Sequence, residues 1–313
     1  MTTTEKIKEL HKEITSLLFP LINNDYVLYD LPYHNNIGDL LIWKGELSFL
    51  KHLPYRMLCC NSIQTYREDR LNPETIILLH GGGNFGDVWR DMQDFRLAVI
   101  KRYPENRIII FPQTVFYENK ALMQEDARIM AQHKDLTICA RDRISYNILK
   151  EHFDNQILLV PDMAFCIPLT ELDQYAKKPL DKTLFLKRSD KELKNANYFF
   201  QSRYPLTTSD WPSMEQSDIV QLGMSVFLRC SKLSLSFLPS LTDKYACFYR
   251  EKLIKQGVQF VSQYKEIYTT RLHVAILSTL LGKPFHFFDN SYGKNRAFYE
   301  TWLNEVDNAI FER

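Results

Sequence analysis

The first half of the chain alternates short apolar runs with longer segments of mixed polarity. The apolar runs have the length of strands, and a helix-length segment follows most of them. This alternation predicts βαβ units and a parallel sheet covered on both faces, as indicated by runs such as Ile108-Ile109-Ile110 in which every residue is apolar. The predicted strands are Tyr26–Tyr29, Arg56–Cys60, Thr75–Leu79, Arg107–Phe111, Leu136–Ala140 and Ile157–Val160. The predicted helices are Leu40–His52, Asp87–Arg102, Ala121–His133 and Asp142–His152.

The second half is less regular. A length of 313 residues is enough for two domains. A boundary is predicted near Pro168–Asp181, which contains proline, lysine and aspartate without clear periodicity, so we expect domains over 1–175 and 176–313. Residues 191–217 show no readable pattern. The predicted strands here are Thr183–Leu186, Val258–Val261, Glu266–Thr269 and Phe285–Phe288, and the predicted helices are Asp218–Cys230 and Asp243–Gln256.

Glycines cluster directly after one predicted strand. Four of the ten glycines, Gly81, Gly82, Gly83 and Gly86, lie within six residues that follow the apolar run 76–79, and Asn84 is among them. This predicts a buried strand that opens into a tight loop, which a ligand can approach closely. The spacing matches neither a dinucleotide-binding motif nor a phosphate-binding P-loop. A turn that only connects strand to helix is the alternative.

Unusual polar residues follow the other predicted strands as well. Asn36-Ile37-Gly38-Asp39, Pro112-Gln113, Arg141-Asp142 and Pro161-Asp162 each come after a different apolar run. The carboxyl ends of parallel strands lie at one edge of a sheet, so these loops should line that edge together. Asp39 has an alternative interpretation as the N-cap of the helix predicted from Leu40, and Asp162 as a turn residue.

A second polar cluster precedes an apolar segment of helix length. Arg271 and His273 fall in the first turn of this predicted helix, Thr270 is its expected N-cap, and Gly282 with Pro284 marks its end. A cation is disfavoured at a helix N-terminus unless an anion is bound there, and no structural partner for these side chains is evident from the sequence. A surface arginine and a packed histidine are the alternative. Lys294 follows the strand predicted at 285–288 and could add positive charge or simply be solvated.

Composition narrows the class of protein. The net charge is +1, so charge gives no reason to expect a nucleic-acid partner. No run of 18 apolar residues exists, and the Lys/Glu-rich segment Met1–Leu18 lacks the apolar core of a secretion signal, so a cytoplasmic protein is expected. Six cysteines without metal spacing favour a reducing compartment, and no cluster of histidine and acidic residues has the spacing of a metal site, so no metal is expected.

Seven of these segments, in this order, resemble the polysaccharide pyruvyl transferase family. They span residues 36 to 294, whereas 171–241 carries little that can be matched. The matching segments are Asn36-Ile37-Gly38-Asp39, Gly81 to Asp87, Pro112-Gln113, Arg141-Asp142-Arg143-Ile144-Ser145, Pro161-Asp162-Met163-Ala164, Arg271-Leu272-His273, and Gly282-Lys283-Pro284 through Tyr292-Gly293-Lys294.

The resemblance implies an α/β fold of two Rossmann-like domains with parallel sheets, similar to GT-B glycosyltransferases, with the active site in the interdomain cleft. It implies transfer of a pyruvyl group from phosphoenolpyruvate to a sugar of an exopolysaccharide or capsular glycan precursor, forming a cyclic ketal and releasing phosphate. No further cofactor is expected. The acceptor is then a sugar or a lipid-linked oligosaccharide, and the protein would work in the cytoplasm, with peripheral association at the inner membrane face if the acceptor is lipid-linked.

The resemblance also assigns residues. It implies that Arg141, Arg271 and His273 bind the donor, and Lys294 could support them. His273 is the first choice for general acid or base, with a fixed hydrogen-bond donor to phosphate as its other role. Asp39 and Asp162 are candidates for the base or for the group that stabilises a cationic C2. Substrate contacts are also expected from Gly81, Gly82, Gly83, Asn84 and Gln113.

Two other functions fit the same features. A glycosyltransferase of the same architecture would use the glycines and the cations to grip the diphosphate of a nucleotide sugar. A carbohydrate-binding or scaffolding protein without activity is the second alternative. A thermal melt separates the three functions. Phosphoenolpyruvate should stabilise a pyruvyl transferase against heat, a nucleotide sugar should stabilise a glycosyltransferase, and neither should stabilise a protein that only binds carbohydrate.

Overall fold

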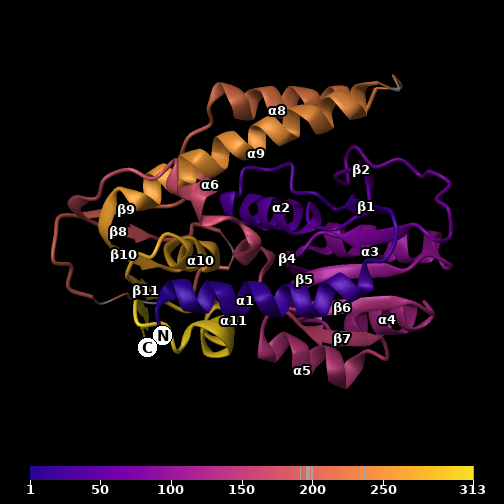
Figure 1. The fold of residues 1–313 in the computed structure, drawn as a ribbon, viewed down its shortest axis with the longest axis horizontal. Coiled ribbons are helices and arrows are strands. Elements are labelled where there is room, and N and C mark those ends of the chain that lie inside the picture. The colour runs from indigo at the N-terminus through magenta and orange to yellow at the C-terminus, as the bar shows by residue number, and fades with distance from the viewer. Residues whose placement is uncertain (191, 195–197, 199, 234, 236, 313) are drawn as a thin grey trace.

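The computed structural model describes residues 1–313 apart from 191, 195–197, 199, 234, 236 and 313, and contains two parallel sheets (Figure 1). In the described chain, the first sheet has seven strands in the order β2-β1-β3-β5-β6-β7, with β4 beside β5. Its strands are β1 Tyr26–Tyr29, β2 Met57–Cys60, β3 Ile76–Leu79, β4 Gly82–Gly86, β5 Ile108–Phe116, β6 Leu136–Ala140 and β7 Gln156–Leu159. The second sheet has the order β12-β11-β10-β8-β9. Its strands are β8 Leu180–Leu186, β9 Leu206–Ser209, β10 Tyr264–Thr269, β11 Phe285–Phe287 and β12 Ala309–Phe311.

Helices cover both sheets and connect their strands (Figure 1). The longer ones are α1 Thr3–Leu18, α2 Ile37–Leu50, α3 Arg90–Arg102, α4 Lys120–Ala131, α5 Arg143–His152, α8 Ile219–Cys230, α9 Leu238–Ser262 and α10 Leu272–Leu280. The short ones are η1 Phe19–Leu21, η2 Met163–Cys166, α6 Leu169–Asp173, α7 Pro212–Glu215, α11 Lys294–Phe298 and the π-helical turn η3 Tyr299–Leu303. The predicted α/β class with parallel sheets is therefore confirmed.

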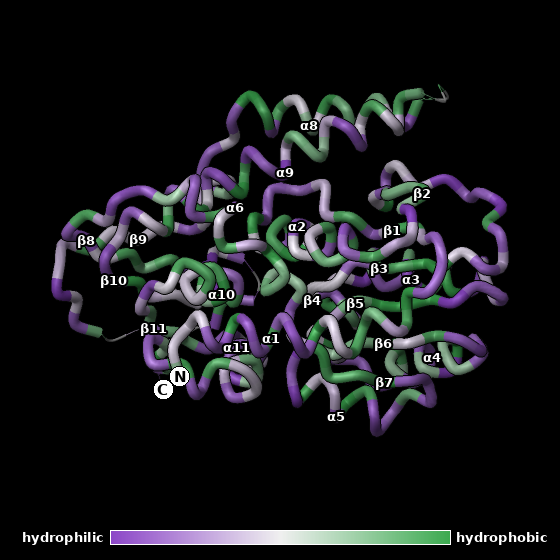
Figure 2. Tube along the Cα trace, in the orientation of Figure 1, coloured by the Kyte–Doolittle hydropathy of each residue, from purple (hydrophilic) through white to green (hydrophobic). Residues whose placement is uncertain are grey.

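Burial explains the apolar runs. Every residue of β1, β3 and β6 is buried, as is all of α10, because helices lie on both faces of these elements. The hydrophobic strands at the centre of the molecule contrast with hydrophilic outer loops (Figure 2). The largest apolar cluster joins side chains from both sheets, with α2, α9 and α10 between them.

Three local predictions were wrong. The glycine segment is not a loop but strand β4, which pairs with β5 where β5 continues past the predicted end at Phe111. Val258–Val261 is not a strand but the last part of α9, because Leu253, Ile254, Val258 and Val261 recur at helical spacing and are buried on one side. The N-cap of α10 is Arg271 rather than Thr270. The segment 191–217 contains β9 and α7, although five of its residues lie outside the described part.

Among the described strands, no pairing joins the parts before and after residue 175. Two helices do connect them. Helix α1 packs on α10, and the Met1 ammonium donates to Asp307 Oδ1 at 2.9 Å. Helix α9 packs on α2. The boundary at 175 and the GT-B-like arrangement remain predictions.

Helices α8 and α9 form an antiparallel arm that extends past the edge of the sheets (Figure 1). We call residues 219–252 the helical arm. In the part of the chain that the structure covers, neither α9 nor any other helix is long and apolar enough to cross a bilayer.

Candidate active site

A cavity of about 440 Å³ lies between the carboxyl ends of the two sheets. The first half of the chain supplies residues from the start of α2, from β4 and from the end of β6. The second half supplies residues that follow β8, β10 and β11. The lining residues that carry the argument are Asp39, Gly83, Asn84, Arg141, Arg188, Glu192, Arg271, His273 and Lys294. Polar residues at strand ends therefore meet as the sequence predicted, and they do so from both sheets.

Arg141, Asp162 and His273 form a chain of contacts beneath the cavity. Arg141 Nη1 donates to Asp162 Oδ2 at 2.8 Å, and its Nε donates to Thr114 Oγ1 at 2.9 Å. Asp162 Oδ2 also lies 3.3 Å from His273 Nε2. The carboxylate joins the end of β6 to the start of α10, so it links the first half of the chain to the second at the cavity.

The electrostatics of Asp162 follow from these contacts. Burial opposes its ionisation, but His273 and Arg141 outweigh burial and hold the pKa of the carboxyl well below its usual range. Asp162 Oδ1 also accepts from the Ala164 amide at 3.0 Å. The contact between Asp162 Oδ2 and His273 Nε2 fixes the orientation of the imidazole, which lies beside the cavity.

Arg271 has a carboxylate partner within the protein. Its Nη2 donates to Asp210 Oδ2 at 2.6 Å and to Asp190 Oδ2 at 3.2 Å, and its Nε contacts Asp210 Oδ1. Both Arg271 and Asp210 are buried. The sequence interpretation that a cation here has no structural partner was wrong, because Asp210 provides one from 61 residues away.

Lys294 and Arg188 share a carboxylate. Lys294 Nζ donates to Glu192 Oε2 at 2.9 Å, and Arg188 Nη1 donates to the same oxygen at 2.7 Å. Burial opposes ionisation of Glu192, but the two cations outweigh it and hold its pKa below the usual range. Burial, together with the charges of Arg188 and Arg141, lowers the pKa of Lys294 despite Glu192. Four cations and their carboxylates thus face one small volume.

Glycines let these groups approach one another. A Cβ on Gly83 would lie 2.9 Å from Lys294 Nζ and 3.0 Å from Arg141 Nη2, so cations from both halves of the chain meet over this residue. A Cβ on Gly38 would lie 2.6 Å from His273 Nδ1. The Arg141 Nη2 group is the part of that guanidinium that its bonds to Thr114 and Asp162 do not use.

Asp39 lies in the first turn of α2. The N-cap is Asn36, whose side chain accepts from the Gly38 amide, so the alternative that made Asp39 the N-cap was wrong. Asn36 Nδ2 donates to Asp39 Oδ2 at 2.8 Å, and His34 Nε2 lies 3.6 Å from the same oxygen. The Asp39 carboxylate therefore faces the cavity with one fixed hydrogen bond.

Besides Asp162, three predicted site residues lie behind the cavity rather than on its lining. Gln113 Nε2 donates to the His80 carbonyl at 2.7 Å, which ties β5 to the end of β3. The Gly81 amide donates to Glu46 Oε1 at 2.8 Å. Gly82 has a φ of 137°, which lets the chain turn from β3 into β4. Their positions suit support of the β4 segment, and a substrate contact from them stays a prediction.

The sequence interpretation missed Arg188, Asp190, Glu192 and Asp210 as site residues. Arg188 and Asp190 follow strand β8 at its carboxyl end, so the rule that found Arg141 applied to them as well. Glu192 and Asp210 lie in or beside the segment 191–217, which has no readable periodicity. No local signal marked these two.

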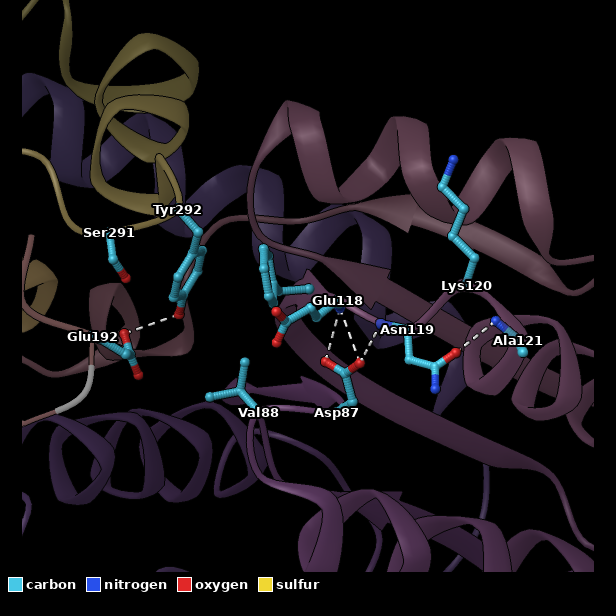
Figure 3. A pocket seen from close by; sticks show the side chains of 10 residues that line it. Asp87, Val88, Glu118, Asn119, Lys120, Ala121, Glu192, Ser291 and Tyr292 are labelled. Atoms are coloured by element: carbon cyan, nitrogen blue, oxygen red, sulfur yellow. Dashed lines mark hydrogen bonds between the residues drawn. The ribbon is translucent and has the colours of Figure 1, made fainter.

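A second opening of about 930 Å³ adjoins the first cavity and shares Glu192 with it (Figure 3). Tyr292 donates its hydroxyl to Glu192 Oε2 at 2.9 Å, and its ring lies 4.6 Å, centre to centre, from that of Phe116. On the other side, Asp87 accepts from the amides of Glu118 and Asn119. Aromatic rings and carboxylates from both halves of the chain thus border this opening.

Comparison with known proteins places the chain in a family. The family model for polysaccharide pyruvyl transferase matches residues 36–292. EpsO of Bacillus subtilis, a candidate pyruvyl transferase, is 32% identical over 98% of this chain and 94% of its own length. Pyruvyl transferase 1 of Schizosaccharomyces pombe is 28% identical over 88% of this chain and 69% of its own.

A solved structure supports the fold. An uncharacterised protein of Klebsiella pneumoniae superposes with a TM-score of 0.63, at 22% identity, over 97% of this chain and 98% of its own. At this identity the likeness concerns the fold alone. The family match covers the segments that carry Asp39, Gly83, Arg141, Arg271 and His273. The chain therefore belongs to the polysaccharide pyruvyl transferase family.

Proposed function

We propose that the protein transfers pyruvyl from phosphoenolpyruvate to two hydroxyls of one sugar in an exopolysaccharide or capsular glycan precursor, and releases phosphate. The observation that carries the proposal is the cavity at which Arg141, Arg188, Arg271 and Lys294 converge. Phosphoenolpyruvate has a phosphate and a carboxylate, so a site for it needs several cations from different directions. The volume of the cavity, about 440 Å³, lies within the range of small-molecule sites.

The reaction balances with no other reagent. The methylene carbon of the donor gains a proton and becomes a methyl group. Two sugar oxygens form bonds to C2, and the bond between C2 and the phosphate oxygen breaks. Of the two hydroxyl protons, one replaces the proton consumed at the methyl group and the other leaves with phosphate. C2 carries positive charge between these steps, so a carboxylate nearby would lower the barrier.

The donor would bind to cationic N–H groups, such as Arg141 Nη2, that are not used in the ion pairs within the protein. Arg141 Nη2 and Lys294 Nζ meet over Gly83, which makes this point the proposed position of the phosphate. Arg271 would bind the other anionic group from the second sheet, since Asp210 holds its guanidinium in one orientation. The paired carboxylates keep the site near charge balance before the donor arrives.

Proton transfer is assigned to His273 and Asp39. Asp162 would orient His273, whose imidazole would deliver a proton to the methylene carbon or to the departing phosphate. Asp39 faces the same cavity and would accept a hydroxyl proton or stabilise C2. Asp162 is buried and its carboxylate contacts both Arg141 and His273, so we assign it a positioning role rather than that of the base.

The acceptor would reach the donor through the adjoining opening. This opening meets the donor cavity at Glu192, and Tyr292 lies beside that residue (Figure 3). The ring of Phe116 borders the opening as well and lies against that of Tyr292. Aromatic faces and carboxylates suit the apolar face and the hydroxyls of a sugar. We propose that the terminal sugar enters the donor cavity and that the rest of the glycan lies along this opening.

The test is phosphate release from phosphoenolpyruvate with a panel of galactosides, glucosides and mannosides, lipid-linked ones included. We expect acceptor-dependent release and a mass gain on the sugar that matches a pyruvyl ketal. The Arg271→Lys variant keeps a charge for Asp210 but loses the planar fork, so it should stay folded and lose at least about tenfold in kcat/KM.

Two results would overturn the proposal. One is no phosphate release together with a thermal shift by a nucleotide sugar but not by phosphoenolpyruvate, which would favour the glycosyltransferase. The other is no shift with any phosphoanion, which would favour a protein that only binds carbohydrate. Turnover of a folded Arg271→Lys protein at the wild-type rate would remove Arg271 from the donor site while leaving the reaction in place.

A further inference from the structure

The helical arm exposes an unusual amount of apolar surface. Of the sixteen large hydrophobic side chains that the described structure exposes, eight lie on residues 219–248. The most exposed are Ile219 at 83%, Leu222 at 60% and Val226 at 57%. The other five are Leu233, Leu235, Phe237, Leu241 and Phe248. Concentration of this kind marks an interaction surface, whereas single exposed hydrophobics carry no such meaning.

The apolar residues follow the helix period. Ile219, Leu222 and Val226 recur at intervals of three and four, which places them on one side of α8. Val220 and Met224 are buried on the other side, where α8 packs on α9. Helix α8 is thus apolar on both sides, as its hydropathy shows (Figure 2), and the described residues cover only one of them. A helix of this composition is normally covered all round.

The charges of the arm have one sign where they face solvent. Its exposed ionisable side chains are Arg229, Lys232, Lys244 and Lys252. Its two acids are turned toward the protein. Asp243 accepts from Tyr33 Oη at 2.8 Å and from Thr65 Oγ1 at 2.7 Å, and Glu251 accepts from Lys44 Nζ at 3.0 Å. These bonds also fix the arm to the first half of the chain.

We infer that the exposed apolar side of the helical arm, which includes Ile219, Leu222 and Val226, docks on the surface of an anionic lipid bilayer. Apolar side chains that alternate with cations match the boundary between acyl chains and acidic headgroups. A symmetric contact between two copies would use the same surface twice and bring like charges together, which disfavours it. The inference goes beyond the proposed reaction and does not depend on it, although it would bring the site to a lipid-linked acceptor.

The test is flotation of the full chain with phosphatidylcholine vesicles that contain or lack phosphatidylglycerol, without substrates. We expect binding to the anionic vesicles only, weakened by high salt. Leu222→Glu and Phe237→Glu should each weaken binding at least about tenfold, because each removes apolar contact and adds negative charge. Ile144→Glu is the matched control, since Ile144 is 51% exposed on α5 and should leave binding unchanged.

Exposed sites tolerate such changes, so all three variants should melt as the wild type does. The inference fails if the protein does not float with anionic vesicles. It also fails if the arm variants float as well as the Ile144→Glu control. A wild-type dimer that Leu222→Glu dissociates, with no vesicle binding, would instead identify the surface as a contact between two copies. Phosphate release with a water-soluble acceptor tests the reaction separately.

Discussion

Gly83→Ala should damage the donor site while sparing the fold. The added Cβ would lie 2.9 Å from Lys294 Nζ and 3.0 Å from Arg141 Nη2. Ordinary contacts begin near 3.4 Å, so the two cations must retreat by about 0.5 and 0.4 Å. Lys294 is held by Glu192 at 2.9 Å and Arg141 by Asp162 at 2.8 Å, so the shift strains both ion pairs.

The magnitude follows from this displacement. A misplacement of about 1 Å at a reacting centre can cost about 100-fold in rate. A displacement of about half that distance therefore predicts a loss of about tenfold in kcat/KM. The melting temperature should change little, because the groups that move are the ends of side chains. The assays are phosphate release from phosphoenolpyruvate and a thermal melt with and without that donor.

Gly86→Ala is the matched control in the same strand. Gly86 has a φ of 123°, and its Cβ would lie 1.8 Å from the Phe116 carbonyl oxygen, so this change must break the pairing of β4 with β5. It should lower the melting temperature clearly, in contrast to Gly83→Ala. Unchanged kcat/KM and donor shift in Gly83→Ala, or a loss of stability as large as that of Gly86→Ala, would refute the reasoning.

Two further predictions concern stability. Asp162 and Glu192 have pKa values lowered in the fold, so the stability that they contribute should be complete above about pH 4 and lost as the pH falls through their folded values. The free energy of unfolding, measured with urea from about pH 6 down to about pH 2.5, should therefore fall less steeply in Glu192→Gln than in the wild type. An identical pH dependence in the two proteins would contradict this. Gly45→Ala would place a Cβ 1.9 Å from the Met163 carbonyl oxygen where α2 packs on η2, and should cost at least about 1–3 kcal/mol of unfolding free energy. A Gly45→Ala protein with the wild-type urea midpoint would show that this contact relaxes freely.

Much of the fold and part of the site could be predicted from local patterns. Apolar runs predicted β1, β2, β3, β6 and β7 to within one residue at each end, because a strand buried on both faces must be apolar throughout. Strand β5 ends at Phe116 instead of Phe111, and β4 was not predicted. The strand-end rule brought Asp39, Gly83 and Arg141 to one edge. The helix-length apolar run that ends at Gly282 placed Arg271 and His273 at the start of α10, where they face the same cavity.

The tertiary structure decided which groups meet. Arg271 pairs with Asp210 and Lys294 with Glu192, across 61 and 102 residues of chain, and no local period encodes such partners. The glycine segment became a strand because β5 runs long enough to pair with it. The sequence by itself thus determined most of the elements of the first half, through periodicity. Packing of the two sheets determined the charge balance of the cavity and the uncovered side of the arm, since both depend on contacts between residues distant in the chain.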